Sequence, residues 1–338
     1  MSRPEISISF RSEPNEKVLQ ETAETVGKYG FDVISVYEDL GDQSPMYPLF
    51  TLAKYSREAR IGPACVVVPK YRTMEPIIGD IARLDSIRPG KAYLGLASGA
   101  WMEQVGIKPA TIQQLREAAD VSKYLLEKRD DGFNGEYYNV KPGFKVNYPT
   151  PERRIPLLIG AWGERMAALA GEIADEIKVG GSANPLMVDI IRKRVNVGVE
   201  RAGRKPEDIG IVLGAVTVVD EDREKALYVA RRRAVVYIDV IGDKDPTAMV
   251  DFPEEIKAIK AAVSHGDVEE AIQHLPDELT SRFLFAGTPN DIIKQTEEIF
   301  AKGATRVEFG SPHGINGIEG IHLLGKKVLP FFEKKGKI

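Results

Sequence analysis

The chain has 338 residues, 43% hydrophobic and 28% charged, so it is long enough to bury one large core or two ordinary ones. A net charge of −4 argues against a nucleic-acid-binding surface. A single cysteine, Cys65, excludes an internal disulfide and is typical of a reducing compartment. No apolar run is long enough to cross a membrane, and the first residues lack the apolar segment of a signal peptide, so we expect a cytoplasmic protein.

Short apolar runs alternate with helical periodicities through the first half of the chain. We expect four strands at residues 5–10, 31–37, 61–68 and 91–96, followed by helices at residues 15–29, 47–59, 75–86 and 111–128. Gly30 is the predicted C-cap of the first helix. The segment 131–148 is rich in Gly, Asn and aromatic residues and predicts a surface hairpin.

The second half repeats the pattern. We expect strands at residues 155–159, 177–179, 209–219 and 305–310, and helices that begin near residues 164, 184 and 220, with a last helix ending near residue 332. Residues 238–280 contain several prolines and read as a partly helical insertion. Thr288 is a candidate N-cap with Pro289 at the first helical position.

Eight strands, each followed by a helix or a helical insertion, predict a single TIM (β/α)8 barrel over residues 1–338, with the two insertions named above. A doubly wound open sheet is the alternative, because a strand count from one sequence can be wrong by one or two. In a barrel the functional site lies at the carboxyl ends of the strands.

Two glycine turns stand at such strand ends, each just before a helix: Gly160-Ala161-Trp162-Gly163 and Gly180-Gly181-Ser182. Glycine lets the backbone approach a ligand closely, and a helix start offers free N–H groups. The pattern favours a phosphate-bearing ligand, although the same glycines could simply make tight turns. Neither turn is a P-loop or a G-x-G-x-x-G motif.

The residues at the other predicted strand ends would line the open end of the barrel, its mouth, with small and apolar side chains and few acids. They are Ser9, Glu38, Asp39, Cys65, Val66, Ala97, Ser98, Gly99, Gly310 and Ser311. Glu38 or Asp39 could polarise a ring or a substrate, but an acidic pair could also only cap a helix. Trp101 and Trp162 could wall the pocket or pack under a loop. The four histidines show no ligand spacing, so no metal site is expected.

Residues 155–185, together with residues 59–69, 85–107 and 285–312, resemble the luciferase-like flavin and deazaflavin-dependent oxidoreductases. Within that family the segments are most similar to the methylenetetrahydromethanopterin reductases, which use coenzyme F420. The resemblance implies a TIM barrel, a homodimer and a small-molecule substrate. It also implies hydride transfer at C5 of a bound deazaflavin, with FMN as the alternative cofactor, and a non-prolyl cis peptide at Ala64–Cys65 or Cys65–Val66.

The candidate site residues, taken from the predicted strand ends and glycine turns, fall into two groups. Glu38, Asp39 and Ser9 are the catalytic candidates. The candidate cofactor-binding residues are Ala64, Cys65, Val66, Ser98, Gly99, Gly160, Ala161, Trp162, Gly163, Gly180, Gly181 and Ser182. No nucleic acid, membrane or metal is expected as a partner.

Two departures bear on the substrate. Ser9 stands where the reductases carry a glutamate after strand one, and Ala100 where they carry an aspartate after strand four. The residues that the resemblance associates with the cofactor are therefore retained better than those it associates with the substrate. We expect an F420-dependent oxidoreductase with another substrate. The alternatives are the pterin reductase itself, an FMN-dependent monooxygenase and a non-catalytic flavin-binding barrel.

Overall fold

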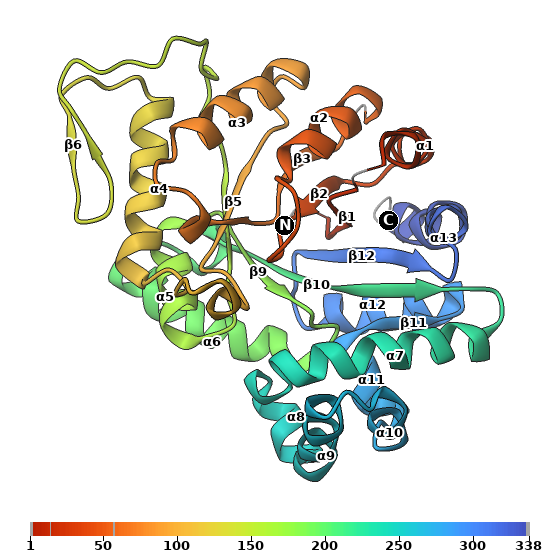
Figure 1. Cartoon of the computed structure of the whole chain (residues 1–338). Helices are drawn as coiled ribbons and strands as arrows, with labels where there is room; N and C mark the ends of the chain where they lie inside the picture. The colour runs from red at the N-terminus through yellow and green to blue at the C-terminus, as the bar shows by residue number, and fades with distance from the viewer. Residues whose placement is uncertain (1–2, 14, 57, 336–338) are drawn as a thin grey trace.

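A computed structural model describes residues 3–13, 15–56 and 58–335. Its main sheet is built from β1 (Glu5–Arg11), β2 (Val33–Tyr37), β3 (Arg60–Pro63), β4 (Val66–Val67), β5 (Leu94–Ala97), β8 (Leu157–Gly160), β9 (Glu176–Gly180), β10 (Gly210–Val219) and β12 (Arg306–Gly314). These strands lie in the order β3-β2-β1-β12-β10-β9-β8-β5-β4 and every neighbouring pair is parallel (Figure 1).

The two ends of the sheet meet at the third strand along the chain, and this closes the sheet into a barrel. The strand expected at residues 61–68 is two pieces: β3 pairs with β2, and β4 pairs with β5. A parallel bridge between Ile61 and Ala92 joins the two ends of the sheet. The eight strand positions thus form a barrel, which confirms the TIM-barrel prediction and excludes the open sheet. The expected continuous strand is wrong, because the chain changes its neighbour at the Ala64–Cys65 peptide, which is cis as predicted.

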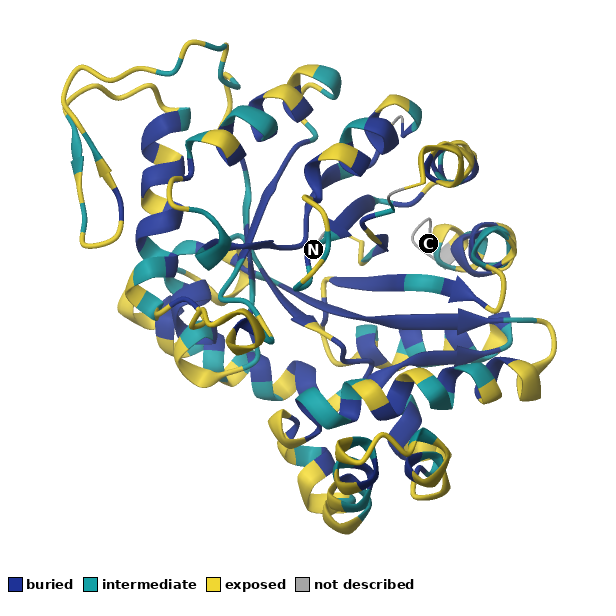
Figure 2. Cartoon of the chain, viewed as in Figure 1, coloured by how far each residue is buried: buried dark blue, intermediate teal, exposed yellow. Residues whose placement is uncertain are grey.

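Helices cover the outside of this barrel (Figure 1). They are α1 (Glu16–Val26), α2 (Met46–Tyr55), α3 (Glu75–Ile87), α4 (Ile112–Leu126), α5 (Glu164–Ile173), α6 (Leu186–Arg201), α7 (Arg223–Ile241), α12 (Pro289–Ala301), α13 (Gly317–Leu323) and α14 (Leu329–Lys335). Each buries its apolar side on the sheet, and Figure 2 shows buried strands inside helices whose outer sides are exposed. Thr288 caps α12 and Pro289 is its first residue, as predicted.

Two early helices are shorter than expected. α1 ends at Val26 with Gly27 as its C-cap, not at Gly30. A Cβ on Gly27 would lie 2.8 Å from the Tyr55 carbonyl oxygen, so close packing between the ends of α1 and α2 sets this boundary. α2 ends at Tyr55 because Ser56 is extended and buried. Position 57, in the expected helix tail, lies outside the described residues.

Both expected insertions are present. Residues 131–148 contain the antiparallel hairpin β6 (Phe133–Asn134) and β7 (Asn139–Val140). The second insertion consists of four short helices, α8 (Pro246–Asp251), α9 (Pro253–Ser264), α10 (Val268–Gln273) and α11 (Asp277–Phe283), which pack beneath α7 in Figure 1. They share a separate apolar cluster with α7.

Two features of the last barrel unit differ from the expectation. Residues 285–287 form a further strand, β11 (Phe285–Gly287), which pairs with β10. β12 continues to Gly314, four residues past the expected end, because its far end pairs with the bulged end of β10. Among the described residues, no helix is both long and apolar enough to cross a membrane.

Candidate active site

A cavity of about 700 Å³ opens at the carboxyl ends of the barrel strands, where the sequence predicted the site. It brings together thirteen of the predicted residues: Ser9, Glu38, Asp39, Ala64, Cys65, Ser98, Gly99, Gly160, Ala161, Trp162, Gly163, Gly180 and Gly181. Because these residues come from β1, β2, β3, β5, β8 and β9 and the turns after them, the pocket exists only when the barrel is closed.

Two predicted cofactor-binding residues do not line this cavity. Val66 is fully buried in β4 and pairs with Leu96. Ser182 is also fully buried, and its hydroxyl accepts a hydrogen bond from the backbone N–H of Asn184 at 3.3 Å. Both side chains are therefore turned into the protein, the first by strand pairing and the second by local capping.

The two glycine turns are joined by Trp162. Its indole Nε1 donates a hydrogen bond to the Gly180 carbonyl at 2.8 Å, and Arg194 donates to the Trp162 carbonyl at 2.6 Å. Gly163 precedes α5 without a side-chain cap. A Cβ added at Gly163 or at Gly180 would meet no atom within 4 Å. The first N–H groups of α5 and the carboxyl end of β9 thus stay open to the cavity, as binding of an anionic group requires.

Glu38 is buried and fully partnered. One carboxylate oxygen accepts a hydrogen bond from Val67 N at 2.7 Å. The other accepts from Tyr71 Oη at 3.1 Å and lies 2.7 Å from Lys70 Nζ. These contacts tie the end of β2 to β4 and the turn that follows it. The carboxylate therefore has a positioning task and little capacity left for a ligand.

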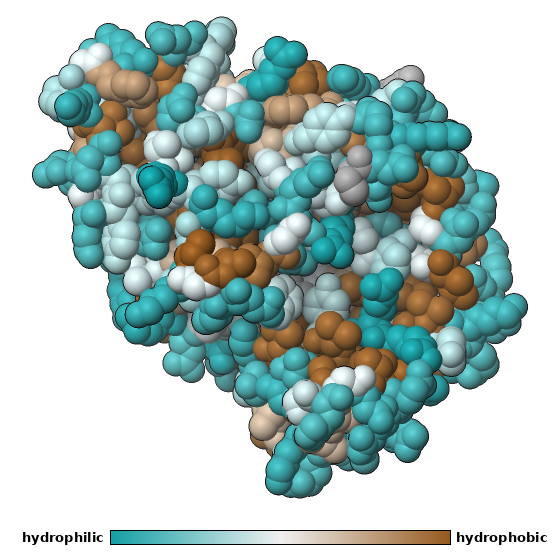
Figure 3. Space-filling view, viewed as in Figure 1, coloured by the Kyte–Doolittle hydropathy of each residue, from teal (hydrophilic) through white to brown (hydrophobic). Residues whose placement is uncertain are grey.

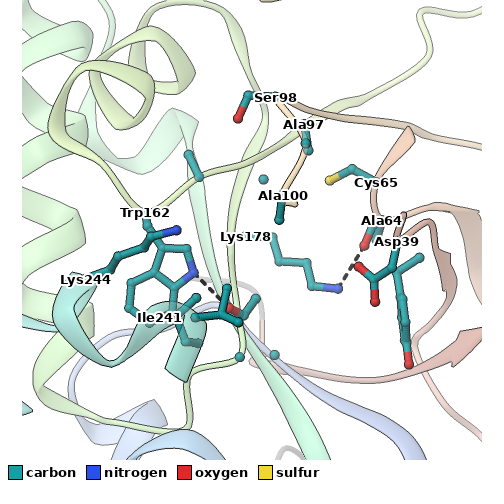
Figure 4. Close-up of a pocket in the computed structure, with 18 of the residues that line it drawn as sticks. Asp39, Ala64, Cys65, Ala97, Ser98, Ala100, Trp162, Lys178, Ile241 and Lys244 are labelled. Atoms are coloured by element: carbon teal, nitrogen blue, oxygen red, sulfur yellow. Dashed lines mark hydrogen bonds between the residues drawn. The ribbon is translucent and has the colours of Figure 1, made fainter. Parts of the chain in front are cut away.

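Asp39 differs from its neighbour. No described residue donates a hydrogen bond to its carboxylate, which faces the pocket (Figure 4). Burial and the nearby Asp42 carboxylate raise the pKa of Asp39, and the positive charges of Arg11 and Lys178 oppose this rise. A carboxyl with a raised pKa and free lone pairs suits proton exchange with a bound substrate.

The cavity floor is more polar than the sequence suggested. Lys178 crosses it and donates a hydrogen bond to the Ala64 carbonyl at 3.1 Å (Figure 4). Lys178 also forms an ion pair with Glu308, which lines the same cavity. Sequence reasoning missed this lysine, although a lysine between Ile177 and Val179 in a buried strand was a visible signal.

Beside Lys178, the Cys65 side chain completes the floor. Burial raises the pKa of its thiol to about 12, so it is not a nucleophile at neutral pH. His313 lies outside the lining: its ring contacts Phe10 and its Nε2 lies 3.0 Å from the Ser9 carbonyl oxygen. Burial lowers the pKa of His313 to about 4, which keeps the ring neutral.

A smaller hollow of about 280 Å³ adjoins the cavity. Both are lined by Asp39, Trp101 and Tyr237, and the hollow adds Arg11, Leu40, Gln104 and Val236. Trp101 has a left-handed backbone, with φ 56°, and is the N-cap of the short 3-10 helix Met102–Val105 that follows β5. Figure 3 shows apolar side chains over α7 on this face, where Val236 is exposed. Asp39 therefore stands where a large and a small compartment meet.

The second insertion also reaches the site, which the sequence did not indicate. Ile241 from the end of α7 and Lys244 from the following turn line the cavity opposite Lys178 (Figure 4). Within the described part of the chain, no group of three His, Cys, Asp or Glu side chains could hold a metal ion.

A model of the luciferase-like monooxygenases matches residues 8–306. The chain belongs to the luciferase-like family. This confirms the resemblance inferred from the sequence, and two of the relatives described below are named as F420-dependent enzymes.

Two curated relatives indicate the branch of the family. The chain is 28% identical to a 5,10-methylenetetrahydromethanopterin reductase of Archaeoglobus fulgidus, over 89% of this chain and 91% of that protein. It is 25% identical to an F420-dependent glucose-6-phosphate dehydrogenase of Nakamurella multipartita, over 98% and 97% of the two chains. The coenzyme F420-dependent tetrahydromethanopterin reductase from Methanopyrus kandleri has a similar fold, with a TM-score of 0.87, 22% identity and coverage of 98% and 100%.

Proposed function

We propose that this luciferase-like protein is a coenzyme F420-dependent oxidoreductase that transfers a hydride between the deazaflavin and a small substrate. The observation that carries the proposal is the open cavity over the two glycine turns, in a chain that is similar to an F420-dependent glucose-6-phosphate dehydrogenase and shares its fold with a coenzyme F420-dependent tetrahydromethanopterin reductase.

The residues present fit such a cofactor. A volume of about 700 Å³ suits a nucleotide-sized ligand. The space in front of Gly163 and Gly180, where a Cβ would meet nothing, is wide enough for a backbone-bound phosphate next to the uncapped start of α5. Ala64 and Cys65 would support the flat ring from the floor, with Ser98 and Gly99 at its edge.

When bound, F420 supplies a carbon that accepts or donates a hydride. The protein's own contribution is to hold the substrate near that carbon and keep water out. We assign the substrate to the smaller hollow, whose lining includes Trp101 and Tyr237. The Asp39 carboxylate would take a proton from a substrate hydroxyl or return it to the oxygen. Ser9, also in the lining, would hydrogen-bond the ligand from β1.

The substrate is proposed to differ from methylene-tetrahydromethanopterin. The small hollow holds about 280 Å³, and Ser9 and Ala100 replace the two carboxylates that the resemblance associates with the pterin. Among the described residues that line the small hollow, Arg11 is the one cation, and it is paired with Asp42 at 2.6 Å. This arrangement favours a small neutral alcohol or carbonyl compound over a sugar phosphate.

The test is a side-by-side titration of the purified protein with F420 and FMN, followed by fluorescence quenching. We expect F420 to bind more tightly than FMN. Preference for FMN would point to a monooxygenase, and binding of neither would overturn the proposal. Turnover with methylene-tetrahydromethanopterin would restore the pterin reductase assignment.

The remaining expectations stay part of the proposal. We propose that the chain acts as one domain carrying its two insertions, and that it forms a homodimer in the cytoplasm. Light scattering coupled to size-exclusion chromatography tests the dimer, since the monomer mass is 37.3 kDa.

A further inference from the structure

Six charged side chains form a continuous column through the inside of the barrel. Arg60, at the start of β3, lies 2.5 Å from Glu5 and 3.1 Å from Glu176. Arg306 lies 2.8 Å from Glu176 and 3.8 Å from Glu308. Glu308 pairs with Lys178 at the pocket floor. The charges alternate in sign along the column, and its last two members, Glu308 and Lys178, both line the pocket.

The Lys178 ammonium is held in place from two sides. Its side chain is only 8% exposed, and the ammonium binds Glu308 and the Ala64 carbonyl. Glu308 is in turn fixed by Ser35, whose hydroxyl donates to it at 2.8 Å. Although burial raises the pKa of Glu308, the charges of Lys178 and Arg306 hold that pKa below its ordinary value. The ionised form of Glu308 is therefore favoured in the folded protein.

Asp39 faces this cation across the same cavity. In Figure 4 the Lys178 side chain extends toward Ala64 and Asp39. The other charged or titratable groups around Asp39 are Arg11, Tyr37, Glu38, Asp42 and Tyr237. Glu38 is neutralised by Lys70, and Arg11 by Asp42. Lys178 is likewise paired, with Glu308, but it is the cation that extends from the pocket floor toward Asp39 (Figure 4), and no described residue donates a hydrogen bond to the Asp39 carboxylate.

We propose that Lys178 is a positioning residue of this site, which holds the Ala64 carbonyl and sets the charge that Asp39 carries when it meets a substrate. A fixed ammonium stabilises the ionised form of a neighbouring carboxyl. It therefore offsets the burial that favours the protonated form of Asp39. The effect on Asp39 is a property of the protein alone, whereas its consequence for turnover rests on the proposed function.

The experiment follows the carboxyl carbon of Asp39 by NMR across a pH titration of the ligand-free protein. The signal is assigned by its absence in Asp39→Asn. The main variant is Lys178→Met/Glu308→Gln, because removing the lysine alone would leave a buried carboxylate without its partner. We expect Asp39 to titrate at higher pH in this variant than in the wild-type protein.

Two further variants separate charge from packing. Glu308→Gln alone leaves the lysine without its counter-charge, so Asp39 is expected to titrate at lower pH. The pair Arg60→Met/Glu5→Gln removes an ion pair at the far end of the same column and is expected to leave the Asp39 midpoint unchanged. If the substitutions acted through a packing defect, the midpoint of the Asp39 titration would shift in the same direction in Lys178→Met/Glu308→Gln and in Glu308→Gln.

An unchanged Asp39 titration midpoint in Lys178→Met/Glu308→Gln would overturn the proposal. A midpoint that shifts in the same direction in this variant and in Glu308→Gln would also overturn it. If the double variant does not fold, Glu308→Gln decides: a lower midpoint supports the proposal, and an equal or higher one overturns it. Failure of F420 to bind would contradict the proposed function without changing the NMR result, so the two failures are distinguishable.

Discussion

The Glu38 carboxylate accepts a hydrogen bond from the backbone N–H of Val67 at 2.7 Å, across the break that separates β3 from β4. β4 is only two residues long and pairs with β5 alone. This contact and the Lys70 ion pair therefore help to attach β4 to the β2 side of the barrel, where the Ala64 N–H also donates to the Val36 carbonyl at 2.9 Å.

We predict that Glu38→Ala destabilises the protein by about 2 kcal/mol, because the buried Val67 N–H loses its acceptor. Glu38→Gln keeps an oxygen for that N–H and should cost less. Chemical denaturation of both variants measures the difference. Equal stabilities for the two would show that the hydrogen bond to Val67 is not what matters.

The Asp39 carboxylate is predicted to carry proton transfer. Asp39→Asn should lower kcat by roughly 100-fold or more, the usual contribution of a positioned acid or base, with little change in F420 affinity. Asp243→Asn is the matched control, since Asp243 lines the same cavity but is exposed and paired with Lys260. Steady-state kinetics with any accepted substrate measures both. An active Asp39→Asn enzyme would remove Asp39 from the mechanism.

The raised pKa of Asp39 has a consequence for stability. A carboxyl that binds its proton more tightly in the folded state loses stability as the pH rises from the ordinary aspartate pKa through the raised value. Asp39→Asn should therefore melt above the wild-type protein at neutral pH, and the difference should disappear at acid pH. Thermal melts across the pH range measure this. A variant less stable than wild type at neutral pH would contradict the burial argument.

Gly180 and Gly181 are predicted to differ on substitution. A Cβ on Gly180 meets no protein atom, so Gly180→Ala should fold normally and weaken F420 binding roughly tenfold. Gly181 has φ +81°, and its Cβ would lie 2.5 Å from Ile241, so Gly181→Ala should lower the melting temperature. Melts and fluorescence titrations distinguish the two. Unchanged F420 affinity in Gly180→Ala would mean that the cofactor does not approach this turn.

The local pattern of apolar and polar residues in the sequence was sufficient to predict the barrel and most of the residues that line its cavity. The alternation of apolar runs with helices predicts eight βα units, and thirteen of the catalytic and cofactor-binding candidates chosen at the ends of those runs line the cavity. The approach works because strand ends in a parallel barrel converge whatever their distance in sequence. Glycine turns before helices are visible without any knowledge of the fold.

The failures have a common origin in long-range contacts. The end of α1 depends on how closely Gly27 meets Tyr55, and the extra length of β12 depends on its pairing with β10. Likewise, no local pattern shows that the insertion after α7 would bring Lys244 to the cavity.

The sequence by itself determined the fold class, the family and the strand ends that make the mouth, because these follow from periodicity and from residues adjacent in the chain. Tertiary structure alone decided the roles within that mouth. Glu38 and Asp39 are neighbours in sequence, yet one is held by Val67 and Lys70 while the other faces the pocket. The physical reason is that a carboxylate's chemistry is set by its surroundings, and those surroundings come from other strands.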